Sequence, residues 1–316
     1  MSFSLEVKSE LSRIEEIGVC CKKSELAGII RAGLGIRSAR GKERLIFATQ
    51  NAPLSRHLFA RVKELYHTGP EVIMLKTRRF RTHAIYRLDF TGFLDHQEDG
   101  LLRDMGLKIE ADLSGIAYQH IALKNRCCKR AYLRGGFMAT GSISDPDKSY
   151  HLEITFSNRV QAKEYMHYLK DFGIDSRSIL RKGHYLVYLK EGQEIVDFLN
   201  VTGAHGALMS LENIRILKEM RNQVNRIVNC ETANLSKTVD ASFRQGESIW
   251  YIKDHAGLES LPKGLYEIAV IRLENPDVSL SELGGMLNPT LSKSGVNHRL
   301  RKIDRIAEEL KHGQNI

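Results

Sequence analysis

The chain has 316 residues, of which 42% are hydrophobic and 27% charged, with a formal net charge of +9. This apolar content excludes a disordered chain, and the length favours two domains with separate cores. No run of 18 apolar residues occurs and the N-terminal segment is charged, so we expect neither a membrane span nor a signal peptide, and a cytoplasmic location.

The positive charge is concentrated near the N-terminus. Residues 1–90 contain 17 Lys or Arg against 9 Asp or Glu, whereas residues 91–204 contain 15 of each kind. A local basic surplus predicts contact with a polyanion, and a merely solvated basic face is the alternative.

An internal duplication follows a predicted N-terminal helix at residues 1–18. Residues 20–36 return at 127–143, an offset of 107 residues. The matched positions are Cys20, Cys21, Lys22, Leu26, Gly28, Ala32 and Ile36 with Cys127, Cys128, Lys129, Leu133, Gly135, Ala139 and Ile143. The repeat predicts one pseudo-twofold domain over residues 19–204, with halves at about 20–110 and 127–204. The repeated helices would meet at the axis, where small residues permit close backbone approach.

Each half is predicted to run helix, two strands, helix, two strands. The later elements are expected at 43–50, 54–66, 72–77 and 82–90, and again at 150–156, 160–172, 174–181 and 184–190. Alternation of apolar and polar residues is the signal for the strands. Lys76, Arg78, Arg79 and Arg81 surround an aromatic residue at a hairpin tip, where we expect them to contact phosphates. A solvated hairpin is the alternative.

The five cysteines form two adjacent pairs and the lone Cys230. They lack the spacing of zinc knuckles, so we expect reduced packing residues. A metal shared across the axis by all four paired thiols is the alternative. The twelve histidines show no ligand spacing, and we assign no metal and no cofactor.

Helical periodicity replaces the strands after Thr202 to Ser210, where Gly203 and Gly206 predict a domain boundary. A long helix is indicated by Ile214, Leu217, Met220, Val224, Ile227 and Val228. Its polar side carries Arg221, Asn222, Asn225, Arg226 and Asn229. The asparagines either read base edges or bond to neighbouring backbone.

A helix-turn-helix is predicted at about 276–309, inside an all-α segment over 210–316. Ser279 and Glu282 fit a capping box, a turn follows at Leu287 to Pro289, and a second helix starts near Ser292. The expected DNA-binding residues of that helix are Lys293, Ser294, Asn297, His298, Arg301 and Arg305. Asn297 and Arg301 carry the side chains that bond bidentately to adenine and guanine. A helical hairpin at a protein interface is the alternative.

Leu26 to Gly33 resembles a degenerate LAGLIDADG motif, the paired central helices of homing endonucleases, and Leu133 to Thr140 resembles a second copy. The C-terminal segment looks like the DNA-reading region of bacterial sigma factors. Together these features resemble the WhiA family of bacterial DNA-binding regulators over nearly the whole chain. The nucleases carry a metal-binding acid at the eighth motif position, which here is Gly33 or Thr140. Asp145 and Asp147 could rebuild at most half of such a site.

The resemblance implies an α+β fold: a duplicated LAGLIDADG-type saddle with two central helices, then an all-α helix-turn-helix domain. It also implies a nucleoid-associated, sequence-specific transcriptional regulator without catalytic residues, tied to sporulation or to cell division and chromosome segregation. Double-stranded DNA is the expected partner, with RNA polymerase or another regulator as a further one. The alternatives are an active or repurposed endonuclease, and an interaction scaffold that touches DNA only through its C-terminal domain.

Overall fold

The computed structural model describes residues 2–39, 42–76, 84–94, 100–110, 113 and 115–313. They form two compact units, Met1–Leu217 and Lys218–Ile316, which divide within one helix. The domain limits expected from the sequence stay a prediction. No helix in the described part of the chain combines the length and the apolar character needed to cross a membrane.

The first unit begins with helix α1 (Phe3–Leu11) and then repeats one order of elements twice. The first half consists of α2 (Val19–Gly33), β1 (Leu34–Ala39), β2 (Lys42–Thr49), α3 (Ala52–Tyr66), β3 (Glu71–Lys76) and β4 (Ala84–Asp89). The second half consists of α5 (Arg126–Thr140), β7 (Gly141–Ile143), β8 (Leu152–Phe156), α6 (Arg159–Lys170), β9 (Arg177–Arg181) and β10 (His184–Leu189). The predicted order of elements is confirmed in both halves.

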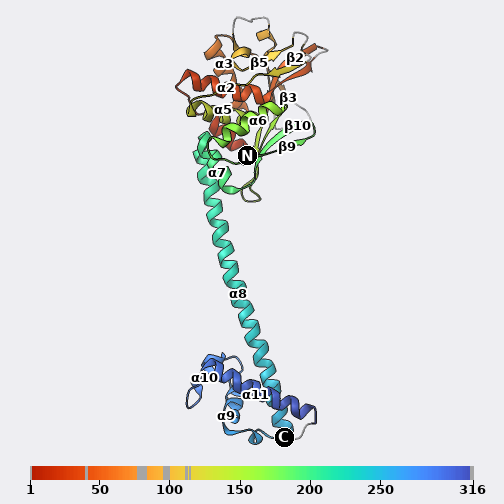
Figure 1. Cartoon of the computed structure of the whole chain (residues 1–316), viewed down its shortest axis with the longest axis vertical. Helices are drawn as coiled ribbons and strands as arrows, with labels where there is room; N and C mark the ends of the chain where they lie inside the picture. Colours follow the sequence, from red (N-terminus) through yellow and green to blue (C-terminus); the bar gives the residue numbers. More distant parts are fainter. Residues whose placement is uncertain are drawn as a thin grey trace. The chain divides into compact units, whose positions relative to one another are not determined.

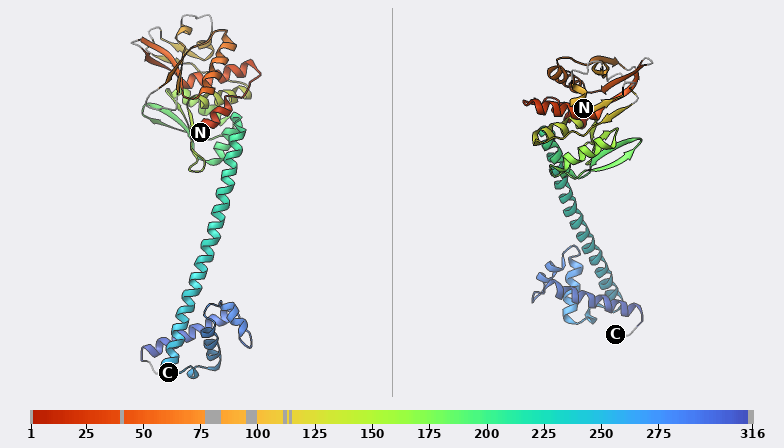
Figure 2. Two further views of the ribbon diagram at one scale, coloured as in Figure 1. Left: turned by 180° about the vertical axis from the view of Figure 1, so that it is seen from behind. Right: turned by 45° about the horizontal axis from the view of Figure 1, so that its top comes forward.

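Both sheets are antiparallel, with strand orders β1-β2-β4-β3 and β7-β8-β10-β9. Figure 1 and Figure 2 show the two sheets on the same side of the adjacent central helices α2 and α5. The fold class predicted from the duplication is therefore confirmed.

Short elements join the halves and close the unit. Between β4 and α5 lie η1 (Thr91–Leu94), α4 (Leu101–Asp104), β5 (Leu107–Ile109) and β6 (Ile116–Tyr118), and after β10 comes α7 (Gly192–Thr202). One continuous hydrophobic core runs through the unit and includes Val7 and Leu11 of α1, Leu26 of α2 and Leu133 of α5. Because α1 shares this core, it is an integral part of the first unit.

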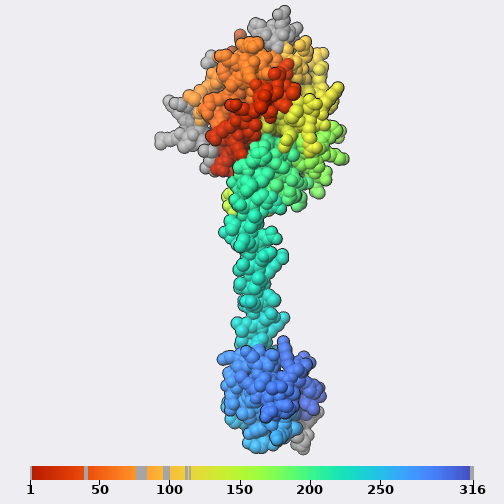
Figure 3. All heavy atoms as spheres, turned by 90° about the vertical axis from the view of Figure 1, so that its left-hand side faces the viewer, coloured from red at the N-terminus to blue at the C-terminus, as the bar shows by residue number. Residues whose placement is uncertain are grey.

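Helix α8 (His205–His255) starts in the first unit and continues into the second. The predicted apolar repeat does lie on one long helix, but Met220, Val224, Ile227 and Val228 are at least half exposed. The middle of α8 is drawn in cyan in Figure 3. The apolar repeat therefore predicted the helix correctly, although its apolar residues do not form a buried face.

The second unit is helical and has its own core. It contains the C-terminal part of α8, then η3 (Leu258–Ser260), α9 (Lys263–Glu274), α10 (Leu280–Met286) and α11 (Lys293–Lys311) (Figure 1). Ile252 of α8, Ile268 of α9, Leu283 of α10 and Leu300 of α11 meet in this core. The all-α C-terminal region predicted from the sequence is confirmed.

Candidate nucleic-acid interface and the closed catalytic position

The central helices cross at paired glycines. A Cβ atom placed on Gly28 of α2 would collide with the carbonyl oxygen of Tyr132 and lie 2.9 Å from the amide nitrogen of Gly136. A Cβ placed on Gly135 of α5 would likewise collide with the carbonyl oxygen of Glu25. Only glycine permits this backbone contact without a shift, which confirms the reason inferred for glycine inside both helices.

The two positions at which the resemblance leads us to expect metal-binding acids, Gly33 and Thr140, carry no carboxylate here. A side chain at Gly33 would collide with the ring of Phe47 and lie 3.3 Å from the Cβ of Ala139. Thr140, the equivalent residue of α5, has a buried hydroxyl that finds no hydrogen-bond partner in the described part of the chain. Asp145 is exposed and accepts the backbone N–H of Asp147 at 3.1 Å, so it shapes its own turn.

A buried charge network occupies one side of the central helices. Glu25 of α2 is fully buried, lies 2.6 Å from His57 Nε2 of α3 and accepts a hydrogen bond from Arg134 Nε of α5 at 2.6 Å. Arg134 also binds Glu16 and the backbone carbonyl of Thr202. Burial alone would raise the pKa of Glu25, but the hydrogen bonds and charges of His57 and Arg134 outweigh it and lower that pKa.

A second network lies at the equivalent place in the other half. Arg31 of α2 is buried and binds both carboxylate oxygens of Glu164 in α6, at 3.2 and 3.3 Å. Tyr132 of α5 donates to Glu164 at 2.8 Å, and Arg31 also donates to backbone carbonyls, including that of Gln119 at 2.9 Å. Burial is the main cause that raises the pKa of Tyr132, so this phenol stays protonated.

The two networks were missed by the sequence reasoning, and the repeat offset relates some of their members without revealing that they pair. At 107 residues, Glu25 and His57 correspond to Tyr132 and Glu164. The acid therefore sits on the central helix in one half and on the flanking helix in the other. In both halves an arginine from the opposite central helix completes the network.

The sheet face opposite the core offers cations in the first half. Strand register places Arg37 of β1, Arg44 of β2 and Arg87 of β4 on the face away from buried Phe47 and Leu88. Arg44 is paired with Asp89 at 2.7 Å. Within the described ranges, Arg37 and Arg87 make no ion pair. Alternation along the strands could have identified both residues.

The basic hairpin predicted between β3 and β4 lies mostly outside the described residues. Arg78, Arg79 and Arg81 lie outside the described residues, and Lys76 ends β3 with only its backbone described. Their contact with DNA stays a prediction. In the second half, Arg177 and Arg181 of β9 are exposed at the corresponding edge.

In the second unit, α10 and α11 form the predicted helix-turn-helix. Ser279 caps α10 with Glu282 in a reciprocal capping box, and the side chain of Ser292 accepts the N–H of Gly295 at the start of α11. Between the helices, the Leu291 N–H donates to the Gly284 carbonyl at 2.9 Å, and a Cβ on Gly284 would collide with the Leu291 carbonyl. Gly284 is therefore what keeps this turn tight.

Helix α11 separates a buried face from a basic one. Val296, Leu300 and Ile303 are almost completely buried. The residues predicted to bind DNA share the other face: Lys293, Ser294, His298, Arg301 and Arg305 are exposed, and Asn297 is half-buried. Among the described residues none of these cations has an ion-pair partner, whereas Arg299 of the same helix donates to the Gly264 carbonyl at 3.0 Å. The exposed cations are therefore free to donate hydrogen bonds to phosphates or base edges.

The polar side of α8 is also uncommitted. Arg221, Asn222, Asn225, Arg226 and Asn229 are all exposed. In the part of the chain that the structure describes, their side chains make no backbone hydrogen bond, which disfavours the capping alternative for the asparagines.

Family models match three consecutive stretches of the chain. Residues 19–108 match the WhiA N-terminal LAGLIDADG-like domain, residues 129–221 the WhiA LAGLIDADG-like domain, and residues 224–307 the WhiA C-terminal HTH domain.

Full-length relatives and one solved structure agree with these matches. The chain is 46% identical over 311 residues to a probable cell division protein WhiA of Ruminiclostridium cellulolyticum, covering 98% of each chain. It is 48% identical over 318 residues to one of Alkaliphilus oremlandii, covering 99% of each. The crystal structure of full-length DUF199/WhiA from T. maritima superposes with a TM-score of 0.58 at 28% identity, covering 98% of this chain and 99% of that one.

Proposed function

The chain belongs to the WhiA family, and we propose that it is a sequence-specific DNA-binding transcriptional regulator that works by binding alone. The curated relatives are described as probable cell division proteins, and the helix-turn-helix domain implies DNA binding. The regulated genes would then serve cell division and chromosome segregation, or sporulation. The protein itself would be cytoplasmic and associated with the nucleoid.

The observation that carries this proposal is the free basic face of α11. Recognition helices enter the major groove and present their N-terminal residues to base edges. Asn297 and Arg301 lie one helical turn apart, so both can face the groove floor, while Lys293 and Ser294 near the helix start suit phosphates or the first base.

The nuclease alternative is disfavoured by the geometry of the motif helices. Hydrolysis of a phosphodiester on two metals needs carboxylate oxygens at the base of both helices. A carboxylate at Gly33 would need the space that the Phe47 ring fills, and Thr140 supplies only a hydroxyl. We infer that the first unit has kept the fold without the catalytic chemistry.

The first unit remains a candidate for a second, nonspecific DNA surface. Arg37 and Arg87 on the outer sheet face support that role, together with the basic surplus of residues 1–90. The alternative is a docking surface for RNA polymerase or another regulator, with DNA contact left to the second unit.

Crosslinking to chromosomal DNA followed by sequencing of the bound fragments tests the regulator proposal. We expect discrete peaks for the parent chain, and transcript changes at neighbouring genes when the protein is depleted. The double variant Asn297→Ala/Arg301→Ala should lose these peaks, whereas Arg244→Ala, an exposed arginine on α8 of the same unit, should keep them. Peaks that survive the double variant would overturn the assignment of α11.

A further inference from the structure

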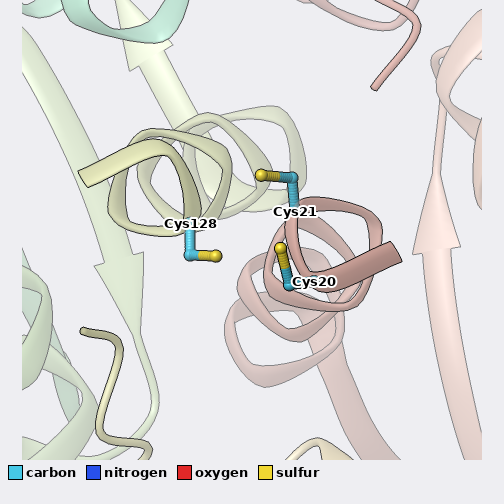
Figure 4. A group of neighbouring side chains, drawn as sticks. All are labelled: Cys20, Cys21 and Cys128. Carbon is cyan, nitrogen blue, oxygen red and sulfur yellow. The ribbon is translucent and has the colours of Figure 1, made fainter. Parts of the chain in front are cut away.

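The two cysteine pairs meet at one end of the central helices. Cys20 and Cys21 lie in the first turn of α2, and Cys127 and Cys128 in the first turn of α5. The Sγ atoms of Cys20, Cys21 and Cys128 all lie within 4.8 Å of one another. Figure 4 shows these three side chains directed into the space between the two helices. Cys127 precedes Cys128 in the same turn of α5, and its sulfur is not one of the three that lie this close together.

Packing accounts for only half of this cluster. Cys21 and Cys128 are buried beside Ala131 and Leu123, as expected for core thiols. Cys20 and Cys127 are exposed, so burial gives no reason for a thiol at either position. The expectation that all four cysteines are packing residues is therefore wrong for the outer two.

We propose that Cys20, Cys21 and Cys128, with Cys127 as a fourth ligand once its side chain turns toward them, form a site for a thiophilic divalent metal ion of the zinc class. Zinc takes four thiolates in a tetrahedron at about 2.3 Å, which puts the sulfurs roughly 3.8 Å apart. The sulfurs of Cys20, Cys21 and Cys128 already lie within 4.8 Å of one another, so they need shifts of only about 1 Å to reach this spacing. Cys127 needs a larger change of its side-chain rotamer.

Burial raises the pKa of the Cys21 and Cys128 thiols, so a thiolate at either position needs positive charge close by. Both pairs lie at helix N-termini, whose partial positive charge stabilises anions. Each pair is followed by two cations, Lys22 and Lys23 in one half and Lys129 and Arg130 in the other. Lys22, Lys23 and Lys129 already pair with carboxylates. The net negative charge that four thiolates leave around a divalent cation is therefore offset mainly by the two helix N-termini.

A metal ion could reach the site from solvent, and its binding would stabilise the first unit. Exposed Cys20 and Cys127 give access from solvent, while buried Cys21 and Cys128 provide the inner wall. We call the interface between α2 and α5, which cross at Gly28 and Gly135, the seam. With two ligands from each half, the ion would hold α2 against α5 at one end of the seam. Binding would therefore stabilise the first unit and release thiol protons.

Metal content of the full-length protein, purified under reducing conditions without chelator, is the direct test. We expect about one zinc per chain by elemental analysis. Co²⁺ added to the metal-free protein should produce a sulfur-to-cobalt charge-transfer band and the strong d–d bands of tetrahedral coordination. Removal of the metal should lower the melting temperature, and added Zn²⁺ should restore it in a concentration-dependent way.

The variants separate ligation from packing. Cys20→Ser/Cys127→Ser changes only the exposed thiols, so the chain should fold and lose the cobalt charge-transfer band, whereas Cys230→Ser should keep both metal and spectrum. Cys21→Ser/Cys128→Ser should lose them too. The proposal fails if the parent holds no stoichiometric metal and gives no charge-transfer band. It also fails if the exposed double variant binds metal like the parent, or if an interhelix disulfide replaces the metal under these conditions.

Discussion

The seam between α2 and α5 and the basic face of α11 use polar residues in opposite ways. In the seam, Arg31 and Arg134 are buried, and each is paired with a buried carboxylate of the first unit. On α11, Arg301 and Arg305 are exposed and make no ion pair within the described residues. The buried charges of the two central helices thus hold the first unit together, whereas cations unpaired among the described residues lie on α11.

This difference teaches where to look for function in a duplicated fold. A motif can be recognisable because of its packing role, as Gly28 and Gly135 show at the helix crossing, and Gly33 leaves no room for a larger side chain beside Phe47. Uncompensated charge on a rigid helix is the better indication of a binding surface.

The largest expected effect is the loss of stability when a buried charge of the seam loses its partner. Arg31→Met leaves the buried Glu164 without its guanidinium partner, and loss of one member of a buried pair typically costs about 3 to 5 kcal/mol. Urea denaturation followed by circular dichroism should show this loss, and Arg56→Met, an exposed arginine on α3, should cost almost nothing. If both variants unfold at the same urea concentration as the parent, the network does not hold the seam together.

A smaller loss is expected at the helix crossing. Gly28→Ala forces a methyl group against the carbonyl of Tyr132, and such overpacking costs about 1 to 3 kcal/mol. Gly35→Ala in β1, where a Cβ meets nothing within 4 Å, is the matched control. Thermal melting of both variants measures the difference, and an unchanged melting temperature for Gly28→Ala would contradict the close crossing.

The pH dependence of stability sharpens the same comparison. The pKa of Glu25 is lower in the folded chain than its ordinary value of 4.5, because His57 and Arg134 more than offset its burial. Its stabilising contribution is therefore complete above pH 4.5 and is lost as the pH falls through the folded pKa. In Glu25→Gln, the decline of unfolding free energy below pH 4.5 should be shallower than in the parent. An equal decline in both proteins would mean that Glu25 does not contribute.

We expect the purified protein to show no nuclease activity. With Gly33 and Thr140 at the metal positions, supercoiled plasmid incubated with Mg²⁺ or Mn²⁺ should remain intact. Asp145→Asn/Asp147→Asn should behave like the parent. Nicking by the purified parent that disappears in this variant would restore the enzyme alternative.

The repeat of 107 residues predicted the arrangement of the first unit because a duplication constrains both halves at once. The capping residues Ser279 and Ser292 likewise predicted where α10 and α11 begin. Both signals are local in the chain, so periodicity and spacing are enough to read them.

Long-range side-chain pairing could not be read in the same way. Arg31 and Glu164 are separated by 133 residues, and each alone resembles a surface charge. The convergence of Cys20 and Cys128 also depends on how closely two helices approach, which the glycines permit but do not specify. The exposure of Val224 and Ile227 was hidden for a different reason, because an apolar repeat has the same period on an open helix as on a buried one.

A salt titration of DNA binding tests the central claim that α11 reads sequence, while the first unit at most holds phosphates. Arg301→Ala and Asn297→Ala should each cost about 1 to 3 kcal/mol on the preferred duplex and leave random duplex nearly unaffected. Arg78→Ala/Arg79→Ala/Arg81→Ala should instead weaken both duplexes alike and flatten the slope of log affinity against log salt by about 2 to 3 units. Equal losses on both duplexes for Arg301→Ala and Asn297→Ala would contradict base reading by α11, and an unchanged slope for the triple variant would remove its three arginines from the DNA surface.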